Sequence, residues 1–90
     1  MTRVLVVDDE PQLRRALQIS LRARGLEVLL AADGTEALHT FRTAQPEIVI
    51  LDIGLPDLDG LEVLAAIRRQ STIPVIMLSA RADSASTCRE

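Results

Sequence analysis

The sequence predicts a three-layer α/β fold in which helices cover both faces of a parallel sheet. The first observation is a set of short, almost purely aliphatic runs, which are typical of strands buried on both faces. The second is that segments with helical spacing of apolar residues separate these runs. Strand–helix–strand units with right-handed crossovers form a doubly wound sheet, whose ligand site lies beyond the carboxyl ends of the strands.

Four segments are predicted as strands. Three are nearly continuous Val, Ile and Leu runs, and the fourth is a weaker run that we expect at an edge of the sheet. The strong runs are residues 3–8, 47–52 and 73–78, and the weaker run is residues 26–31.

Three segments between these runs are predicted as amphipathic helices. Pro11 suits the first turn of the first helix and Gly25 ends it. Asp33, with Glu36 three residues later, resembles a capping box at the start of the second helix. The residues predicted to share one face are Leu13, Ala16, Leu17 and Leu21 in the first helix, Ala37, Leu38 and Phe41 in the second, and Leu61, Leu64 and Ala65 in the third.

The composition is that of one small domain. The chain has 90 residues, 48% of them hydrophobic and 26% charged, and Phe41 is its only aromatic residue. A net charge of -3 and the lack of aromatics for base stacking argue against nucleic-acid contact by this segment. All ten basic residues are Arg, so the chain contains no Lys.

The sequence is typical of a cytoplasmic protein. Cys88 is the only cysteine, which excludes an intrachain disulfide. No apolar run approaches the roughly 20 residues that span a membrane, and the first run leads directly into Asp8-Asp9-Glu10, unlike a signal peptide. We therefore expect a cytoplasmic location and no membrane contact.

Acidic residues follow two of the strong runs. Asp8 and Asp9 come after the first, and Asp52 ends the run at residues 47–52. If these strands are neighbours, the carboxylates meet at one edge of the sheet, where they repel each other unless a cation lies among them. Carboxylate oxygens favour a hard ion such as Mg²⁺. Asp57 and Asp59 are interpreted as helix-start residues outside this site.

Four motifs lie at the predicted strand ends and helix starts: Val7-Asp8-Asp9-Glu10-Pro11, Asp33-Gly34, Leu51-Asp52 with Leu55-Pro56-Asp57-Leu58-Asp59-Gly60, and Leu78-Ser79-Ala80-Arg81. Together they resemble the receiver domain of two-component response regulators. The resemblance is assigned to residues 1–83, and residues 84–90 are predicted as an irregular tail. The wording from Gly54 to Asp57 is most similar to the winged-helix transcription-factor branch, and within it to the potassium-transport regulators.

The resemblance implies a flavodoxin-like sheet with strand order 2-1-3-4, truncated after the fourth strand. It also implies that Asp52 is the phosphoacceptor for a phosphoryl group from a sensor histidine kinase, and that Ser79 is the switch hydroxyl. Mg²⁺ would be held by Asp8, Asp9, Asp52 and the backbone carbonyl of Gly54. Such a module is a signalling domain rather than a turnover enzyme.

The chain departs from the family pattern in two ways. The family places a Lys after a fifth strand, and both this Lys and the fifth strand are missing from the 90 residues. We therefore expect impaired switching. We also expect apolar surface on the third and fourth strands, and self-association through it, because the helix that covers this face in the family is absent.

Two other functions remain open. A phosphohydrolase of the haloacid-dehalogenase type also uses an Asp nucleophile with Mg²⁺, but it requires Asp-x-Asp where this chain has Asp8-x-Glu10. Turnover of a phosphate ester would favour it over the receiver. The second alternative is a non-phosphorylated interaction module or a nonfunctional remnant. Partner binding that persists after Asp52→Asn, together with no phosphate uptake, would favour it.

Overall fold

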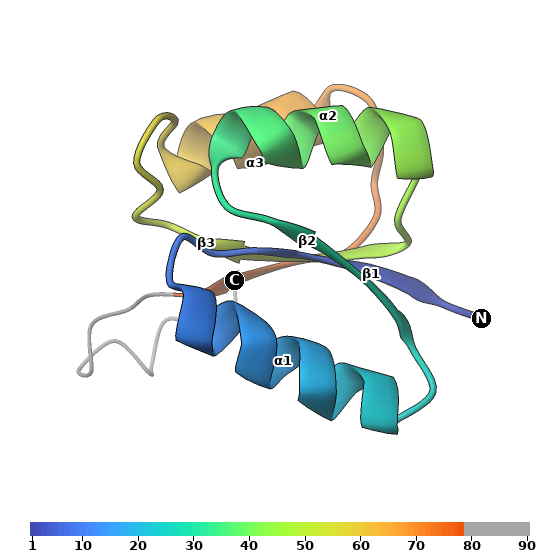
Figure 1. Ribbon diagram of the computed structural model, residues 1–90. Coiled ribbons are helices and arrows are strands. Elements are labelled where there is room, and N and C mark those ends of the chain that lie inside the picture. The colour runs from blue at the N-terminus through green and yellow to red at the C-terminus, as the bar shows by residue number, and fades with distance from the viewer. Residues whose placement is uncertain (79–90) are drawn as a thin grey trace.

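The computed structural model describes residues 1–78, which form a four-stranded parallel sheet between two layers of helices (Figure 1). The elements in chain order are β1 (Arg3–Val7), α1 (Pro11–Ala23), β2 (Glu27–Ala31), α2 (Gly34–Ala44), β3 (Ile48–Asp52), α3 (Gly60–Arg68) and β4 (Val75–Leu78). Each predicted strand and helix is therefore present. Ser79 and residues 84–90 lie outside the described residues.

The strand order is β2-β1-β3-β4, as predicted, with all neighbours parallel. The register brings the carboxyl ends of the strands to one edge of the sheet. Val7 at the end of β1 pairs with Ala31 of β2 and with Leu51 of β3, and Asp52 pairs with Leu78 of β4. The weak run at residues 26–31 lies at the sheet edge, in agreement with the prediction.

The two faces of the sheet are covered unequally. Helices α2 and α3 cover one face and α1 the other (Figure 1). The larger core lies on the α2–α3 side, and its buried members include Leu5, Val7, Ala37, Phe41, Val49, Leu51, Val63, Ile67 and Met77. The smaller core on the α1 side consists of Val4, Val6 and Val28, with Leu17 and Leu21 of α1 packed against them.

Helix α1 covers only part of its face. Its predicted apolar face is divided, because Leu17 and Leu21 pack on the sheet whereas Leu13 is 39% exposed and Ala16 is also exposed. Ile76 of β4 is 43% exposed. Its neighbours Val75 and Met77 face the α2–α3 core, so alternation along the strand places Ile76 on the α1 side. The described residues thus leave apolar side chains exposed on this face.

Local residues fix the helix ends. Pro11 is the first residue of α1, and Gly25, at φ 85°, follows its end. The Asp33 carboxylate accepts a hydrogen bond from the Glu36 N–H at 2.8 Å, which confirms Asp33 as the cap of α2. The predicted capping box is shifted by one residue, however, because the Glu36 carboxylate accepts from the Ala32 N–H at 2.8 Å rather than from that of Asp33.

The predicted face of α3 was wrong at Leu61 and Ala65, whereas Leu64 is partly buried and packs against the core as expected. Leu61 is 58% exposed and Ala65 is exposed, and the buried residues are instead Gly60, Val63, Ala66 and Ile67. The first turn of α3 lies directly against the end of β3, and a Cβ on Gly60 would be 2.7 Å from the Asp52 carbonyl oxygen. This contact turns the helix so that positions i, i+3 and i+7 from Gly60 face the sheet.

No helix within residues 1–78 has the length and apolar character that crossing a membrane requires.

Candidate metal and phosphoacceptor site

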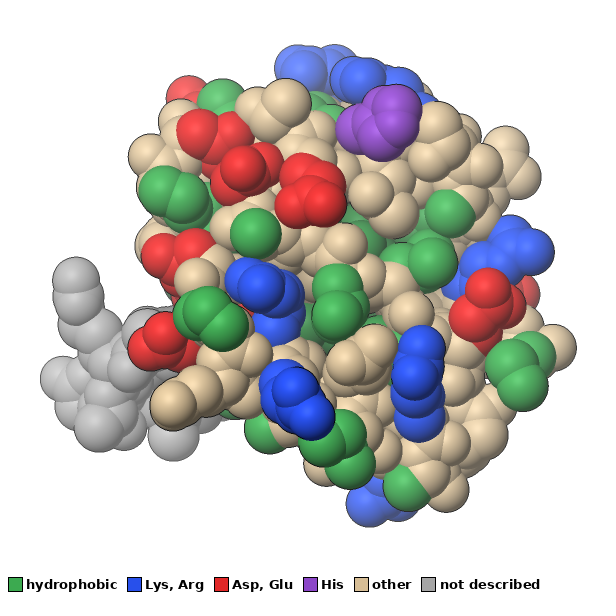
Figure 2. All heavy atoms as spheres, in the orientation of Figure 1, with side chains coloured by type: hydrophobic (Ala, Val, Ile, Leu, Met, Phe, Trp, Pro, Cys, Tyr) green, Lys and Arg blue, Asp and Glu red, His purple; other side chains and the backbone are tan. Residues whose placement is uncertain are grey.

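Three carboxylates converge at the carboxyl edge of the sheet. Asp8 directly follows β1, Asp9 is the next residue, and Asp52 ends the neighbouring strand β3. Each contributes one carboxylate oxygen to a group in which all the atoms lie within 4.8 Å of one another. The convergence predicted from the sequence is therefore present. Figure 2 shows acidic side chains gathered on this side of the visible face, whereas the arginines are spread widely.

The turn after β1 holds Asp8 in place. Its backbone N–H extends the ladder by donating to the Ala31 carbonyl at 3.1 Å, and its Oδ1 accepts from the Glu10 N–H at 2.8 Å. The Arg14 guanidinium on α1 donates to the Asp8 carbonyl oxygen at 2.9 Å. The sequence does not predict this role of Arg14, because nothing in its spacing distinguishes it from a solvent-exposed helix residue.

Two of the three carboxylates in the cluster are buried, which raises the free energy of their charged forms. Asp8 is 3% exposed and Asp52 is 5% exposed, whereas Asp9 is exposed. Burial raises the pKa of Asp52 above its usual range, and the neighbouring Asp8 and Asp9 charges raise it further, against a lowering contribution from the Gly54 N–H. Deprotonated carboxylates in this position repel one another, so the site favours a bound cation.

Gly54, the second residue of the β3–α3 loop, has its backbone N–H near this cluster. Its N–H faces Asp52 Oδ1 at 3.4 Å, a weak contact. The role of its carbonyl as a metal ligand stays a prediction. The same holds for Ser79, which lies outside the described residues.

The two acidic residues later in the loop lie outside the three-carboxylate cluster, as predicted. Asp59 caps α3 and forms a full capping box with Glu62. Asp57 caps a different helix from the one that follows it: its carboxylate accepts from the N–H groups of Gly34 and Thr35 at the start of α2, at 2.7 and 3.0 Å. A contact between residues so far apart in sequence has no local pattern that predicts it.

Hydrogen bonding lowers the pKa of the Asp57 carboxyl group. The Thr35 hydroxyl donates to Oδ2 at 2.6 Å and is the largest cause of a pKa well below the usual range for a carboxyl group. The N–H groups of Gly34, Thr35 and Leu58 lower the pKa further.

The donor set fits a small divalent cation. All three side chains are carboxylates, and hard cations with oxygen ligands, such as Mg²⁺, are bound by one or a few such groups together with water. A cation there would also relieve the repulsion around Asp52. A carboxylate at the end of a parallel strand, beside a cation site, is suited to attack on an electron-poor phosphorus.

Comparison with known families identifies the class of protein. The family described as response regulator receiver domain matches residues 4–89, so the chain belongs to this family. It is thus a receiver domain of two-component response regulators, a signalling module, as the sequence predicted. The match extends past residue 83, and the boundary between domain and tail stays a prediction.

The similar curated proteins are transcription regulators. The chain is 54% identical over 84 residues to the transcriptional regulatory protein KdpE of Mycobacterium tuberculosis, covering 93% of the chain and 37% of that protein. It is 48% identical over 83 residues to CseB of Streptomyces coelicolor, covering 92% of the chain and 36% of that protein. The chain thus spans little more than a third of the length of these relatives. The resemblance to the transcription-factor branch is confirmed, and the finer one to potassium-transport regulators stays a prediction.

The similar solved structures share the fold. The response regulator TrrA of Thermotoga maritima, solved in complex with Mg²⁺–BeF, has a TM-score of 0.86 and 41% identity, covering 96% of this chain and 76% of that one. TrrA in complex with the histidine kinase ThkA gives a TM-score of 0.84 and 40% identity, covering 100% of this chain and 82% of that one. The flavodoxin-like topology predicted from the sequence is confirmed.

Proposed function

We propose that this chain accepts a phosphoryl group on Asp52 from the phosphohistidine of a sensor histidine kinase, with Mg²⁺ bound beside it. The observation that supports this most is the group of three carboxylates within 4.8 Å, in which Asp52 is almost fully buried at the end of β3. The similarity to TrrA, solved both with Mg²⁺–BeF and with a histidine kinase, points to the same chemistry.

Each residue has a distinct task in this reaction. An Asp52 oxygen attacks the phosphorus, the new O–P bond forms as the P–N bond to the donor imidazole breaks, and the imidazole leaves with the bonding electrons. Asp8, Asp9 and Asp52, with the Gly54 carbonyl, would hold the ion. Mg²⁺, when bound, supplies the positive charge that phosphoryl oxygens need in the transition state.

The surroundings of Asp52 favour it over Asp8 as the acceptor. Asp8 is committed to the Glu10 N–H through its Oδ1, and its backbone is held by Ala31 and Arg14. Within residues 1–78, Asp52 Oδ1 accepts one weak contact, from the Gly54 N–H at 3.4 Å. Its side chain is therefore the less restrained of the two buried carboxylates.

The proposal extends to the partners of the longer protein. We expect the chain to be the receiver part of a cytoplasmic transcription regulator, in which segments outside these 90 residues contact DNA. The net charge of -3 agrees with DNA contact by other segments.

The test is intact-mass analysis after incubation with acetyl phosphate and Mg²⁺. Wild type is expected to gain the mass of one phosphoryl group, and Asp52→Asn is expected to gain none. Asp59→Asn is the matched control, because it removes one carboxylate from the α3 cap, outside the cluster, and should load normally. No adduct on the wild type would overturn the proposal, and repeated turnover of a phosphate ester would favour the phosphohydrolase instead.

A further inference from the structure

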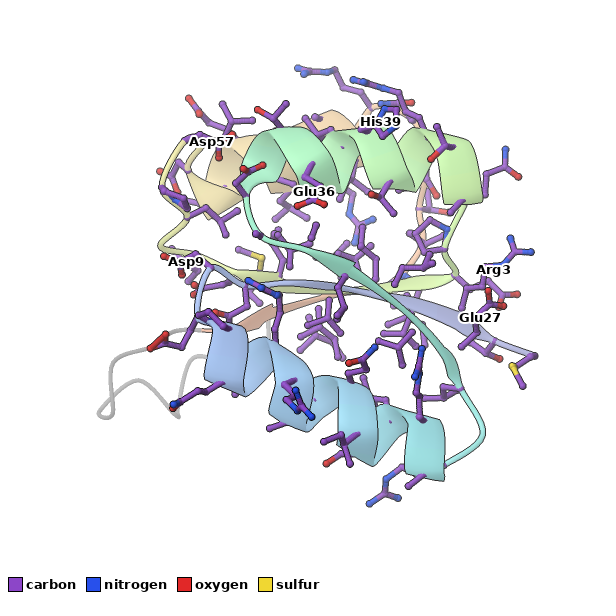
Figure 3. All side chains as sticks on the ribbon, viewed as in Figure 1. Arg3, Asp9, Glu27, Glu36, His39 and Asp57 are labelled. Carbon is purple, nitrogen blue, oxygen red and sulfur yellow. The ribbon has the colours of Figure 1, made fainter. Side chains whose placement is uncertain are left out.

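The β3–α3 loop is fastened to a helix that is distant in sequence. Asp57, labelled in Figure 3, lies in this loop beside the start of α2. Its Oδ1 accepts from the N–H groups of Gly34 and Leu58, both at 2.7 Å, and its Oδ2 accepts from the N–H of Thr35 at 3.0 Å and from its hydroxyl at 2.6 Å. Asp57, Gly34 and Thr35 are called the loop clamp below.

The loop also lies in direct contact with α2. A Cβ on Gly34 would be 2.6 Å from the Cβ of Leu58, so the two segments approach as closely as a glycine permits. At the other end of the loop, the Gly60 N–H donates to the Ile53 carbonyl at 3.0 Å. Residues 53–56 therefore lie between two fixed points, the hydrogen bond from Gly60 to Ile53 and the loop clamp at Asp57.

The residue predicted as a metal ligand lies in this stretch. Gly54 is exposed, and a Cβ there would meet no atom of residues 1–78 within 4 Å, so packing by this part of the chain does not hold it. Its N–H contact with Asp52 is long, at 3.4 Å. Only Leu55 and Pro56 separate Gly54 from Asp57. A movement of Asp57 would therefore change the position of Gly54, because few backbone dihedrals between them can absorb it.

We infer that Asp57 is a positioning residue for the metal site: by binding the start of α2, its carboxylate fixes residues 53–56 so that Gly54 faces Asp52, and this strengthens Mg²⁺ binding. The effect on Mg²⁺ binding rests on the proposed function, whereas the effect of Asp57 on the position of residues 53–56 does not. The charge of Asp57 suits its place, because a carboxylate is favourable at the positive end of a helix dipole.

The experiment measures two properties of each variant of the 90-residue chain. The first is amide hydrogen exchange of residues 53–55 without metal, since Pro56 has no N–H, and the second is Mg²⁺ affinity by titration calorimetry. The variants are Asp57→Ala, which removes the clamp, Thr35→Val, which removes one hydrogen bond, and Thr35→Ser, which keeps the hydroxyl. Asp33→Ala is the matched control, because it removes the cap of the same helix without touching the clamp.

Asp57→Ala is expected to speed exchange in residues 53–55 and to weaken Mg²⁺ binding about tenfold, the effect typical of losing a residue that orients a ligand. Thr35→Val is expected to show a smaller loss in both, and Thr35→Ser is expected to restore both. Asp33→Ala is expected to lower the melting temperature but to keep the Mg²⁺ affinity of wild type. Thr35→Val also tests the inference if Asp57→Ala does not fold.

Unchanged exchange in Asp57→Ala and Thr35→Val would overturn the inference. An affinity loss no larger than that of Asp33→Ala would also overturn it, because it would reflect stability alone. If wild type binds no Mg²⁺, the proposed function fails and the metal role of Asp57 fails with it. Wild-type binding that the clamp variants leave unchanged would overturn the inference alone.

Discussion

Asp52→Asn is expected to stabilise the chain when no divalent metal is present. Asp8 and Asp52 are both almost fully buried, with carboxylate oxygens no more than 4.8 Å apart. At that separation two charges repel by about 1 kcal/mol in a water-like dielectric and about 3 kcal/mol at an effective dielectric of 20. Asn keeps the shape of the side chain and an oxygen for the Gly54 contact, so most of this repulsion is relieved without a new cost.

The assay is thermal unfolding by circular dichroism at pH 7 in EDTA and again in Mg²⁺. For a domain of this size about 1 kcal/mol moves the melting temperature by roughly 4–8 °C, so Asp52→Asn is expected to melt at least that much higher in EDTA. With Mg²⁺ at ten times its dissociation constant, wild type gains about 1.4 kcal/mol, and the difference is expected to shrink by that amount.

The control is Asp59→Asn, which changes the net charge equally but lies outside the cluster and keeps a good helix cap. Its melting temperature is expected to match wild type in both buffers. A lower melting temperature for Asp52→Asn than for wild type in EDTA would refute the reasoning, because it would mean that the buried carboxylates do not oppose folding.

Three further predictions concern other parts of the chain. The pKa of Asp57 in the folded chain lies below its ordinary value of 3.8, so the stability that its charge contributes is present above pH 3.8 and is lost as the pH falls further. The difference in melting temperature between wild type and Asp57→Asn is therefore expected to shrink below pH 3.8. A difference that stays constant with pH would contradict this. Gly60→Ala places a Cβ 2.7 Å from the Asp52 carbonyl oxygen and is expected to cost about 1–3 kcal/mol in urea unfolding, whereas an unchanged midpoint would show that the backbone adjusts freely. Ile76, 43% exposed on the α1 side of the sheet, is expected to promote self-association, so Ile76→Asn should lower the sedimentation coefficient at high concentration; a wild type that stays monomeric would contradict this.

The sheet was predictable because each strand carries its own pattern. A continuous aliphatic run such as Val4 to Val7 indicates a strand buried on both faces without reference to the rest of the chain. The pairing of β1 with β3 then follows from the doubly wound topology, and it brings Asp8 and Asp52 together. The carboxylate cluster was therefore predictable to the level of individual residues.

The contacts that the sequence could not predict all depend on close approach between segments. The buried face of α3 is set by the contact of Gly60 with the end of β3, and helical spacing alone wrongly placed Leu61 and Ala65 on it. Asp57 stands just before α3 but binds the start of α2, and Arg14 binds a backbone carbonyl. Such contacts depend on the packed positions of two segments, which no local pattern contains.

The parallel pairing of β1 with β3 also bears on folding kinetics. Because α1, β2 and α2 separate Val7 from Leu51 in the chain, closing this contact is costly in chain entropy, and we expect the carboxylates to come together late. An ion bound there would stabilise the native state far more than the transition state. We therefore expect Mg²⁺ to lengthen the lifetime of the folded chain by slowing its unfolding, with little effect on the rate at which it folds.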